Sequence, residues 1–342
     1  MKRLLTTATA FALLSGAAQA EGTLSVYHWF EYIPQELVDK FTAETGIAVT
    51  IDTYDSNESM LAALKAGKLG QYDVAVPADF MVKIMTDEGM LDTFTTEEMP
   101  NHGNIAPQWM DVYFDPGRKS SIPYQWGGTS FSVNRDVYPG DISSLAIIFD
   151  PPPELQGKIN VLDSQNEVLI LGSLYLGIPQ CTTDREQLKA LNDMLLNAKQ
   201  HWASFGSDTS KDVLVSGDAA AGMIYNGFSA KARAEGANVE YSYPKEGHVL
   251  WMDNMVLLKD APNRENAIKF MNFLLVPENA AAVTNYAAYT AGVTGVEPFL
   301  DDAIKNSPEN NPPADATPGV FAQACDAETQ KLYDAIWTNL KK

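Results

Sequence analysis

Hydrophobic and polar residues alternate over 24–28 near the start of the chain. This period of two predicts a β-strand. Apolar residues then recur at helical spacing over 35–45, after Pro34 and before Gly46. Proline is common at helix starts and glycine at helix ends, so this segment predicts a helix. The two elements form a strand–turn–helix unit.

The turn between this strand and this helix carries Trp29, Phe30, Glu31 and Tyr32. Ligands of open α/β sheets bind beyond the carboxyl ends of strands. Ring faces attract cations, and a carboxylate supplies a full opposite charge, so these residues suit an organic cation. The alternative is a loop whose aromatic rings pack on the core.

The next hundred residues repeat the pattern of strand and helix. Strands are predicted over 47–54 and 72–76, and a helix is predicted over 80–89. Asp55 to Glu58 resembles a capping box for a helix that reaches Gly67. Regular alternation of strands and helices indicates a doubly wound α/β domain.

The second part of the chain contains two candidate crossings between domains. These are alternating strands over 121–134 and 249–257, and further strands are predicted over 158–162 and 222–227. Helices are predicted after Asn263 and over 328–340. One long amphipathic helix is also predicted, with Leu188, Leu191, Leu195 and Trp202 inward and with Thr183 and Glu186 as its cap.

Several later turns repeat the chemistry of the first one. Glu167 follows the strand over 158–162, Tyr225 closes another strand, and Tyr289 follows a helix. Trp251 and Asp253 are two residues apart, so they project to the same face of a strand. The alternatives are core positions for Tyr225 and Trp251 and a solvated helix start for Glu167.

The first twenty residues have the pattern of a signal peptide. Lys2 and Arg3 precede an apolar run, and Ala18 to Ala20 have the small-residue pattern of a cleavage site. The run is too short to span a bilayer. We expect residues 1–20 to be removed and a soluble protein that starts at Glu21 to be exported to the periplasm.

Composition and charge narrow the class of protein. The chain has 342 residues, of which 45% are hydrophobic and 20% charged, enough for two globular domains. The net charge is −20, and loss of Lys2 and Arg3 leaves 22 basic against 44 acidic residues, a net charge of −22. This balance argues against nucleic acid as a partner and is compatible with small cations.

Two cysteines, Cys181 and Cys325, occur in the sequence. An oxidising compartment permits a disulfide between them, and the alternative is two buried thiols. Neither cysteine has a CxxC partner or a neighbouring histidine, which argues against metal binding or catalysis.

An ordered series of motifs resembles the bacterial periplasmic spermidine/putrescine-binding proteins across nearly the whole mature chain. The motifs are Tyr27–Ile33, Asp55–Glu58, Tyr72–Pro77, Pro123–Gly127, Gly222–Gly227, Pro244–Gly247 and Trp251–Asp253. The resemblance implies an α/β fold of two lobes, each a mixed sheet flanked by helices, hinged by crossing strands. The expected lobes are 21–131 plus 250–298, and 132–249 plus 299–342.

The resemblance also implies a set of ligand-binding residues. They are Trp29, Phe30, Glu31, Tyr32, Phe80, Ser164, Glu167, Tyr225, Trp251, Asp253, Tyr289 and Gln323. This chain departs from the family at Ala78 and Phe80, which lack hydroxyl groups, and at Phe30, which replaces a small hydroxyl residue. Ser164 stands where spermidine-preferring members have an aspartate, so we expect putrescine to be preferred or little discrimination.

The expected function is that of a receptor that delivers putrescine or spermidine to the membrane permease of an ABC importer. We expect a monomer without cofactor, metal or catalytic activity. The alternatives are a two-lobed receptor for another cationic solute or ferric iron, and a glycosidase that uses Glu31, Glu167 and Asp253 as acids. The sequence contains no GxSxG, HExxH, GxGxxG or P-loop motif.

Overall fold

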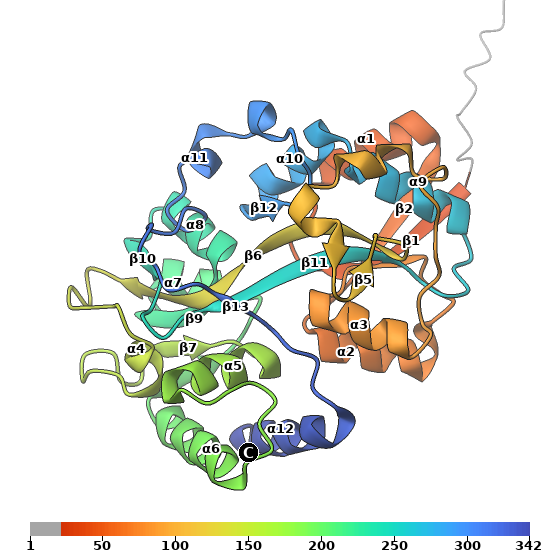
Figure 1. Cartoon of the computed structure of the whole chain (residues 1–342). Helices are drawn as coiled ribbons and strands as arrows, with labels where there is room; N and C mark the ends of the chain where they lie inside the picture. Colours follow the sequence, from red (N-terminus) through yellow and green to blue (C-terminus); the bar gives the residue numbers. More distant parts are fainter. Residues whose placement is uncertain (1–21) are drawn as a thin grey trace, which may run out of the picture.

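A computed structural model describes residues 22–342 of the chain. The predicted signal peptide, 1–20, and the expected first mature residue, Glu21, lie outside the described residues. Two α/β lobes are joined by two long strands, β6 (Ser121–Asn134) and β11 (Val249–Leu257), which run from one lobe into the other (Figure 1). These strands pair with each other in antiparallel register. The predicted two-lobed fold and its crossing strands are confirmed.

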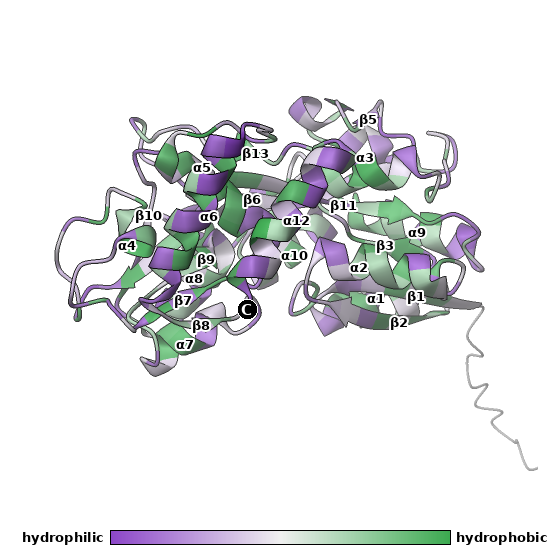
Figure 2. Ribbon diagram, turned by 90° about the horizontal axis from the view of Figure 1, so that it is seen from below, coloured by the Kyte–Doolittle hydropathy of each residue, from purple (hydrophilic) through white to green (hydrophobic). Residues whose placement is uncertain are grey.

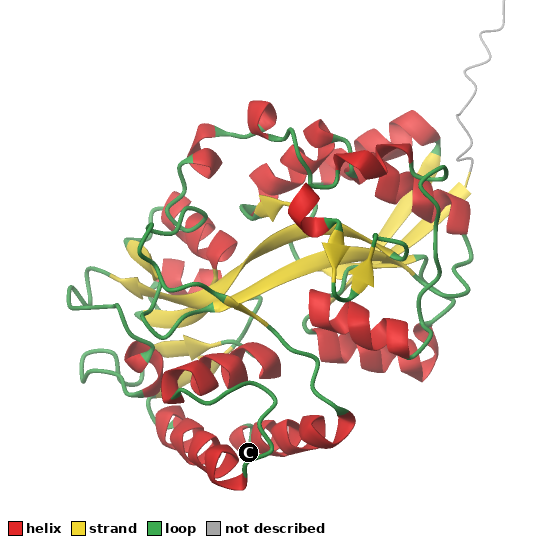
Figure 3. Ribbon diagram, viewed as in Figure 1, coloured by secondary structure: helices red, strands yellow, loops and turns green. Residues whose placement is uncertain are grey.

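The strands of both lobes belong to one sheet, in the order β2-β1-β3-β11-β6-β9-β7-β8. In the first lobe β1 pairs in parallel with both β2 and β3, and in the second lobe β7 pairs in parallel with β8 and β9. Figure 3 shows the sheet passing through the whole molecule, with helices around it. These strands are β1 (Gly22–Trp29), β2 (Ile47–Tyr54), β3 (Val74–Ala75), β7 (Ile159–Val161), β8 (Trp202–Phe205) and β9 (Ala221–Tyr225).

Helices cover the sheet in both lobes, and the lobes stand side by side when viewed from below (Figure 2). Those around the first half are α1 (Gln35–Thr45), α2 (Asn57–Ala63), which continues as the π-turn Leu64–Lys68, α3 (Asp79–Asp87), α9 (Arg264–Leu274) and α10 (Pro277–Ala287). Those around the second half are α4 (Ala146–Phe149), α5 (Gln165–Leu176), α6 (Arg185–Lys199), α7 (Ser210–Ser216), α8 (Asn226–Ala234) and α12 (Ala327–Leu340).

Short elements complete the chain. The strands β10 (Val239–Ser242) and β12 (Thr290–Ala291) pair with β6, and β13 (Val320–Phe321) pairs with β11. The strands β4 (Asp111–Val112) and β5 (Asp115–Pro116) form a separate pair. The remaining helical segments are the 3₁₀ turns Pro100–Asn104, Pro107–Trp109 and Glu297–Phe299 and the helix α11 (Asp302–Lys305).

The first strand–turn–helix unit forms as its sequence predicts. Helix α1 spans Gln35–Thr45, and Gly46 ends it in the left-handed conformation at φ 72°. Leu37, Val38 and Phe41 are buried on its inner face. Glycine suits this position because it has no Cβ to clash with the preceding carbonyl.

Three predicted details are wrong. The capping box of α2 consists of Ser56 and Ser59, because their side chains and backbone N–H groups bond reciprocally, and Glu58 takes no part. Helix α6 is capped by Asp184 and ends at Lys199, so Trp202 belongs to β8. The strand predicted over 72–76 is reduced to β3, Val74–Ala75.

Cys181 and Cys325 form a disulfide, with 5.3 Å between their Cα atoms and 144 residues of sequence separation. The disulfide that the oxidising compartment permits is therefore present. It joins the loop after α5 to the segment before α12. None of the helices formed by residues 22–342 is both long and apolar enough to span a bilayer.

Candidate functional site

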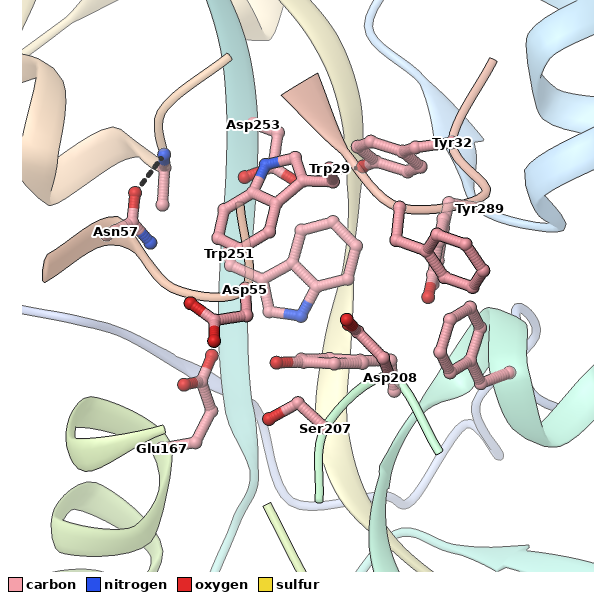
Figure 4. A pocket seen from close by; sticks show the side chains of 14 residues that line it. Trp29, Tyr32, Asp55, Asn57, Glu167, Ser207, Asp208, Trp251, Asp253 and Tyr289 are labelled. Carbon is pink, nitrogen blue, oxygen red and sulfur yellow. Dashed lines mark hydrogen bonds between the residues drawn. The ribbon is translucent and has the colours of Figure 1, made fainter. Parts of the chain in front are cut away.

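A cavity of about 70 Å³ lies where the carboxyl ends of the parallel strands of both lobes meet β11 (Figure 4). Such ends are where open α/β sheets bind ligands, because the chain turns there from strand to helix. Seven aromatic and four acidic residues dominate the wall. The lining residues are Trp29, Phe30, Tyr32, Asp55, Asn57, Ala78, Glu167, Ser207, Asp208, Tyr225, Phe228, Trp251, Asp253 and Tyr289.

Trp251 and Asp253 form the base of the cavity. Both lie on β11 and face the same side, as their spacing predicts. The pairing of β11 with β6 shifts in register after Asp253, and a bulge of this kind re-aims side chains. Asp253 is 7% exposed, and the Tyr32 hydroxyl donates to its Oδ2 at 2.9 Å. The carboxylate is thus held in place between the lobes.

The aromatic walls support one another edge to face. The ring of Tyr289 is 4.9 Å from Trp251 and 5.5 Å from Tyr32, and Tyr225 is 6.1 Å from Trp251. The indole N–H of Trp251 donates to the Thr129 hydroxyl at 3.1 Å. Edge-to-face packing and this hydrogen bond restrict ring rotation, so the walls are preorganised.

Two glycines leave the space that these rings occupy. A Cβ on Gly127 would lie 2.7 Å from the Trp251 ring, and one on Gly227 would lie 2.5 Å from the Tyr289 ring. Real Cβ atoms do not approach other atoms so closely, so any larger residue would displace the rings. Both glycines belong to motifs in which the sequence resembles the polyamine-binding family.

The first lobe adds two supports near the mouth. The Trp29 indole N–H donates to the Val76 carbonyl at 2.8 Å, which attaches the end of β1 to the residue after β3. The Asn57 side chain accepts from the Ala78 N–H at 2.9 Å. This bond joins the start of α2 to the start of α3.

Burial and mutual repulsion raise the pKa values of the cavity carboxyls. Burial raises the pKa of Asp253 well above its usual range, and the charges of Asp79 and Glu167 raise it further, while the Tyr32 hydrogen bond opposes the change. Burial raises the pKa of Glu167, and burial together with Asp55 raises that of Asp208. Of the fourteen lining residues none is basic. A bound cation would therefore restore the ionised forms.

Asp79 is a buried carboxyl that does not itself line the cavity. It is 1% exposed at the start of α3, and neither oxygen has a well-formed hydrogen bond among the described residues. Burial raises its pKa to about 7, although nearby backbone N–H groups, that of Met252 first, partly oppose this. The residue before it, Ala78, forms a β-bridge with Asp253, and the charge of Asp79 helps to raise the pKa of Asp253.

The structure brings most of the predicted site residues together. Eight of them line the cavity: Trp29, Phe30, Tyr32, Glu167, Tyr225, Trp251, Asp253 and Tyr289. Phe30 stands at the edge, with 47% of its surface exposed.

The other four predicted residues lie elsewhere. Glu31 is exposed in the left-handed conformation at φ 48°, and the cavity wall does not include it. Ser164 is buried at the cap of α5, and its hydroxyl donates to the Glu167 carboxylate behind the wall. Phe80 and Gln323 line a second cavity instead.

Six lining residues were not among the predicted site residues: Asp55, Asn57, Ala78, Ser207, Asp208 and Phe228. Asp55 and Asn57 follow β2 directly, so the rule that led to Trp29 could have found them too. Ser207 and Asp208 follow β8. The first residue of β8, Trp202, continues the apolar spacing of the preceding helix, so the sequence predicts a helix at this position.

Two α/β lobes with a cavity between them at a pair of crossing strands define the class of periplasmic binding proteins. The family model described as "Bacterial extracellular solute-binding protein" matches residues 36–312. The "Spermidine/putrescine-binding periplasmic protein" of Escherichia coli (strain K12) is 34% identical over 342 residues, with 99% of this chain and 98% of that protein covered. The chain belongs to the bacterial extracellular solute-binding proteins, and among them to the spermidine/putrescine-binding periplasmic proteins.

Two further relatives resemble the chain over nearly its full length. The "Putrescine-binding periplasmic protein SpuD" of Pseudomonas aeruginosa (strain UCBPP-PA14) is 33% identical, with 100% of this chain and 99% of that protein covered. The solved structure of the spermidine/putrescine ABC transporter substrate-binding protein PotD from Streptococcus pneumoniae has a TM-score of 0.76 and 30% identity, with 94% and 99% covered.

Proposed function

We propose that this protein is a periplasmic receptor that binds a linear di- or polyamine in the cavity between its lobes. The main observation behind this proposal is that seven aromatic and four acidic side chains, and no basic one, line the cavity. The names of the relatives, which specify putrescine and spermidine, support the same ligand class.

A polyamine fits this wall chemically. It is a methylene chain with separated ammonium groups, and flat aromatic faces suit the methylenes. An unpaired buried charge costs several kcal/mol, so each ammonium needs a carboxylate. Cation–π contacts add about 0.5–2 kcal/mol each once water is excluded.

The proposed contacts divide between the two ammonium groups. Asp253, fixed by Tyr32 and flanked by Trp251, takes one ammonium. Glu167 in the second lobe and Asp55 in the first take the other, since their side chains lie next to each other at the opposite end of the cavity (Figure 4). One ligand would then hold residues of both lobes.

The cellular role follows from this ligand and from the family. We propose export after removal of residues 1–20, work in the periplasm as a monomer, and transfer of the ligand to the permease of an ABC importer. We propose no catalytic activity and no cofactor. The lobes that would close on the ligand are those proposed from the sequence, 21–131 plus 250–298 and 132–249 plus 299–342.

Isothermal titration calorimetry of the mature protein with putrescine, cadaverine, spermidine and spermine tests the proposal. We expect saturable binding of at least one amine. Asp253→Asn should weaken that binding by about 2–5 kcal/mol, because the ammonium loses its buried partner. Glu265→Gln, which removes one exposed charge in the first turn of α9, serves as a control. No binding of any of the four amines would refute the proposed function.

A further inference from the structure

A second cavity, of about 320 Å³, lies between the lobes next to the first. Helices α2 and α3 of the first lobe form one side, and α5, α12 and the disulfide form the other. Its walls are largely apolar and include Leu61, Phe80, Met81, Ile84, Leu169 and Ile170. A methylene chain can pack against such a surface.

Three of the polar groups that line the second cavity are carboxyl or hydroxyl groups that could accept hydrogen bonds from an ammonium group. Asp334 is exposed at the rim, and Glu58 is half-buried in the first turn of α2. Ser173 is 2% exposed, and its hydroxyl has no hydrogen-bond partner among the described residues. One basic residue, Lys65, also lines the cavity, but its ammonium donates to Glu88 at 2.6 Å.

The two cavities share their dividing wall. Asn57 lines the first cavity and Glu58 the second, and in the same way Glu167 lines the first and Asn166 the second. At the start of α2 in the first lobe and of α5 in the second lobe, one residue therefore lines the first cavity and its neighbour in sequence lines the second. A linear ligand that passes Glu167 would enter the second cavity beside Glu58.

Electrostatic coupling links the carboxyls along this path. The charge of Glu167 raises the pKa of Asp253 in the first cavity. Burial raises the pKa of Glu58 to about 7, and Glu167, Asp334 and Asp55 each raise it further, against hydrogen bonding to the Glu58 backbone N–H. Asp253, Glu167, Glu58 and Asp334 thus form a series of acids that runs through both cavities. Such a series matches a chain with more than two ammonium groups.

We infer that the second cavity binds the additional aminoalkyl arm of a triamine or tetraamine, with Glu58 as the partner of its ammonium and the Ser173 hydroxyl as an acceptor. This inference rests on the proposed function and specifies its ligand further. Ser164 cannot balance a charge, but Glu58 supplies a carboxylate from the opposite lobe. We therefore expect this protein to bind spermidine and spermine more tightly than the neutral Ser164 side chain alone would predict.

Calorimetric titrations of putrescine, spermidine and spermine into wild type and Glu58→Gln at pH 8, above the pKa of Glu58, test this inference. We expect the variant to bind spermidine and spermine about tenfold more weakly, because a charge-assisted hydrogen bond is lost. Its affinity for putrescine should change less than about twofold, because a diamine ends before the second cavity. Ser173→Ala should act in the same direction with a smaller effect.

Glu328→Gln is the matched control, since Glu328 is an exposed glutamate in the first turn of α12 and does not line the cavity. An unchanged ratio of spermidine to putrescine affinity in Glu58→Gln would overturn the inference. An equal loss for both ligands would also overturn it. Failure of the wild type to bind any of the amines would instead refute the proposed function.

Discussion

Gly127 lies directly opposite Trp251 on the neighbouring strand. The space that a Cβ would need at Gly127 is filled by the Trp251 ring and by the Asn226 side chain, whose Oδ1 would lie 2.5 Å away. The position of the central ring therefore depends on the absence of a side chain at Gly127.

Gly127→Ala should displace the Trp251 ring and weaken polyamine binding by about 1–3 kcal/mol, because overpacking forces side chains out of their rotamers. Calorimetry and the tryptophan fluorescence of the free protein measure the two effects. Gly103→Ala is the control, since no atom lies within 4 Å of the position that a methyl group would take there. A Gly127→Ala variant that binds like wild type would contradict the proposed role of the ring.

Asp79 gives the stability of the protein a pH dependence. Its pKa is about 7 in the folded state against an ordinary value of 3.8. Between these two pH values the folded state therefore holds a proton that the unfolded chain has lost. Stability from this group is present below pH 4 and is lost as the pH rises through 7. Glu167 and Asp253 face the group as like charges, and Arg118 and Tyr113 lie near it.

Asp79→Asn should therefore be more stable than wild type at pH 8, and its stability should fall less between pH 5 and pH 8. The rise of about three pH units in the pKa of Asp79 sets an upper limit of about 4 kcal/mol on the loss of unfolding free energy that this group causes at high pH. Urea denaturation at both pH values measures this difference. Asp87→Asn, an exposed position on the same helix, is the control. Identical pH profiles for Asp79→Asn and wild type would argue against a buried, unsatisfied carboxyl.

The sequence predicts some of the residues that line the first cavity but not others. Trp251 and Asp253 follow from a period of two, which a strand imposes on its side chains. Glu31 looked equivalent to its aromatic neighbours, but a left-handed backbone at φ 48° takes it away from the cavity wall. A turn conformation of this kind is set by the contacts around it and leaves no periodic signal.

At the scale of elements, helix α6 and strand β8 show where periodicity misleads. Trp202 continues the helical spacing of Leu188, Leu191 and Leu195, yet α6 ends at Lys199 and Trp202 pairs with Ile159 of β7. Pairing with a distant strand decides this boundary, and spacing along the chain does not contain that information. Ser207 and Asp208 are missing from the predicted site for the same reason, because they follow a strand that the spacing along the chain does not reveal.

The disulfide is the covalent link between two such elements. It closes a loop of 144 residues and fixes one wall of the second cavity. Cys181→Ser with Cys325→Ser should lower the free energy of unfolding by about 2–5 kcal/mol, because the unfolded chain regains freedom. Differential scanning calorimetry measures the fall in Tm. Asp163→Asn, which breaks the ion pair between Asp163 before α5 and Lys341 at the end of α12, is the control. A double variant as stable as wild type would mean that packing alone holds these segments.

At the scale of the whole molecule, β6 and β11 explain why the first cavity is lined by residues of both lobes. They are the strands that cross between the halves of the sheet, and Trp251 and Asp253 stand on β11 where it crosses. The sequence predicts both crossings, because each is a long alternating strand between α/β units. The shape of the space between the lobes was not predictable, because it depends on how helices from both halves meet.

A crystal structure of the mature protein grown with spermidine tests the central claim most directly. It should show the amine between the lobes, with one ammonium within hydrogen-bonding distance of Asp253 and the methylene chain against Trp251. Spermidine bound outside the space between the lobes, or bound there without contact to Asp253, would contradict the account.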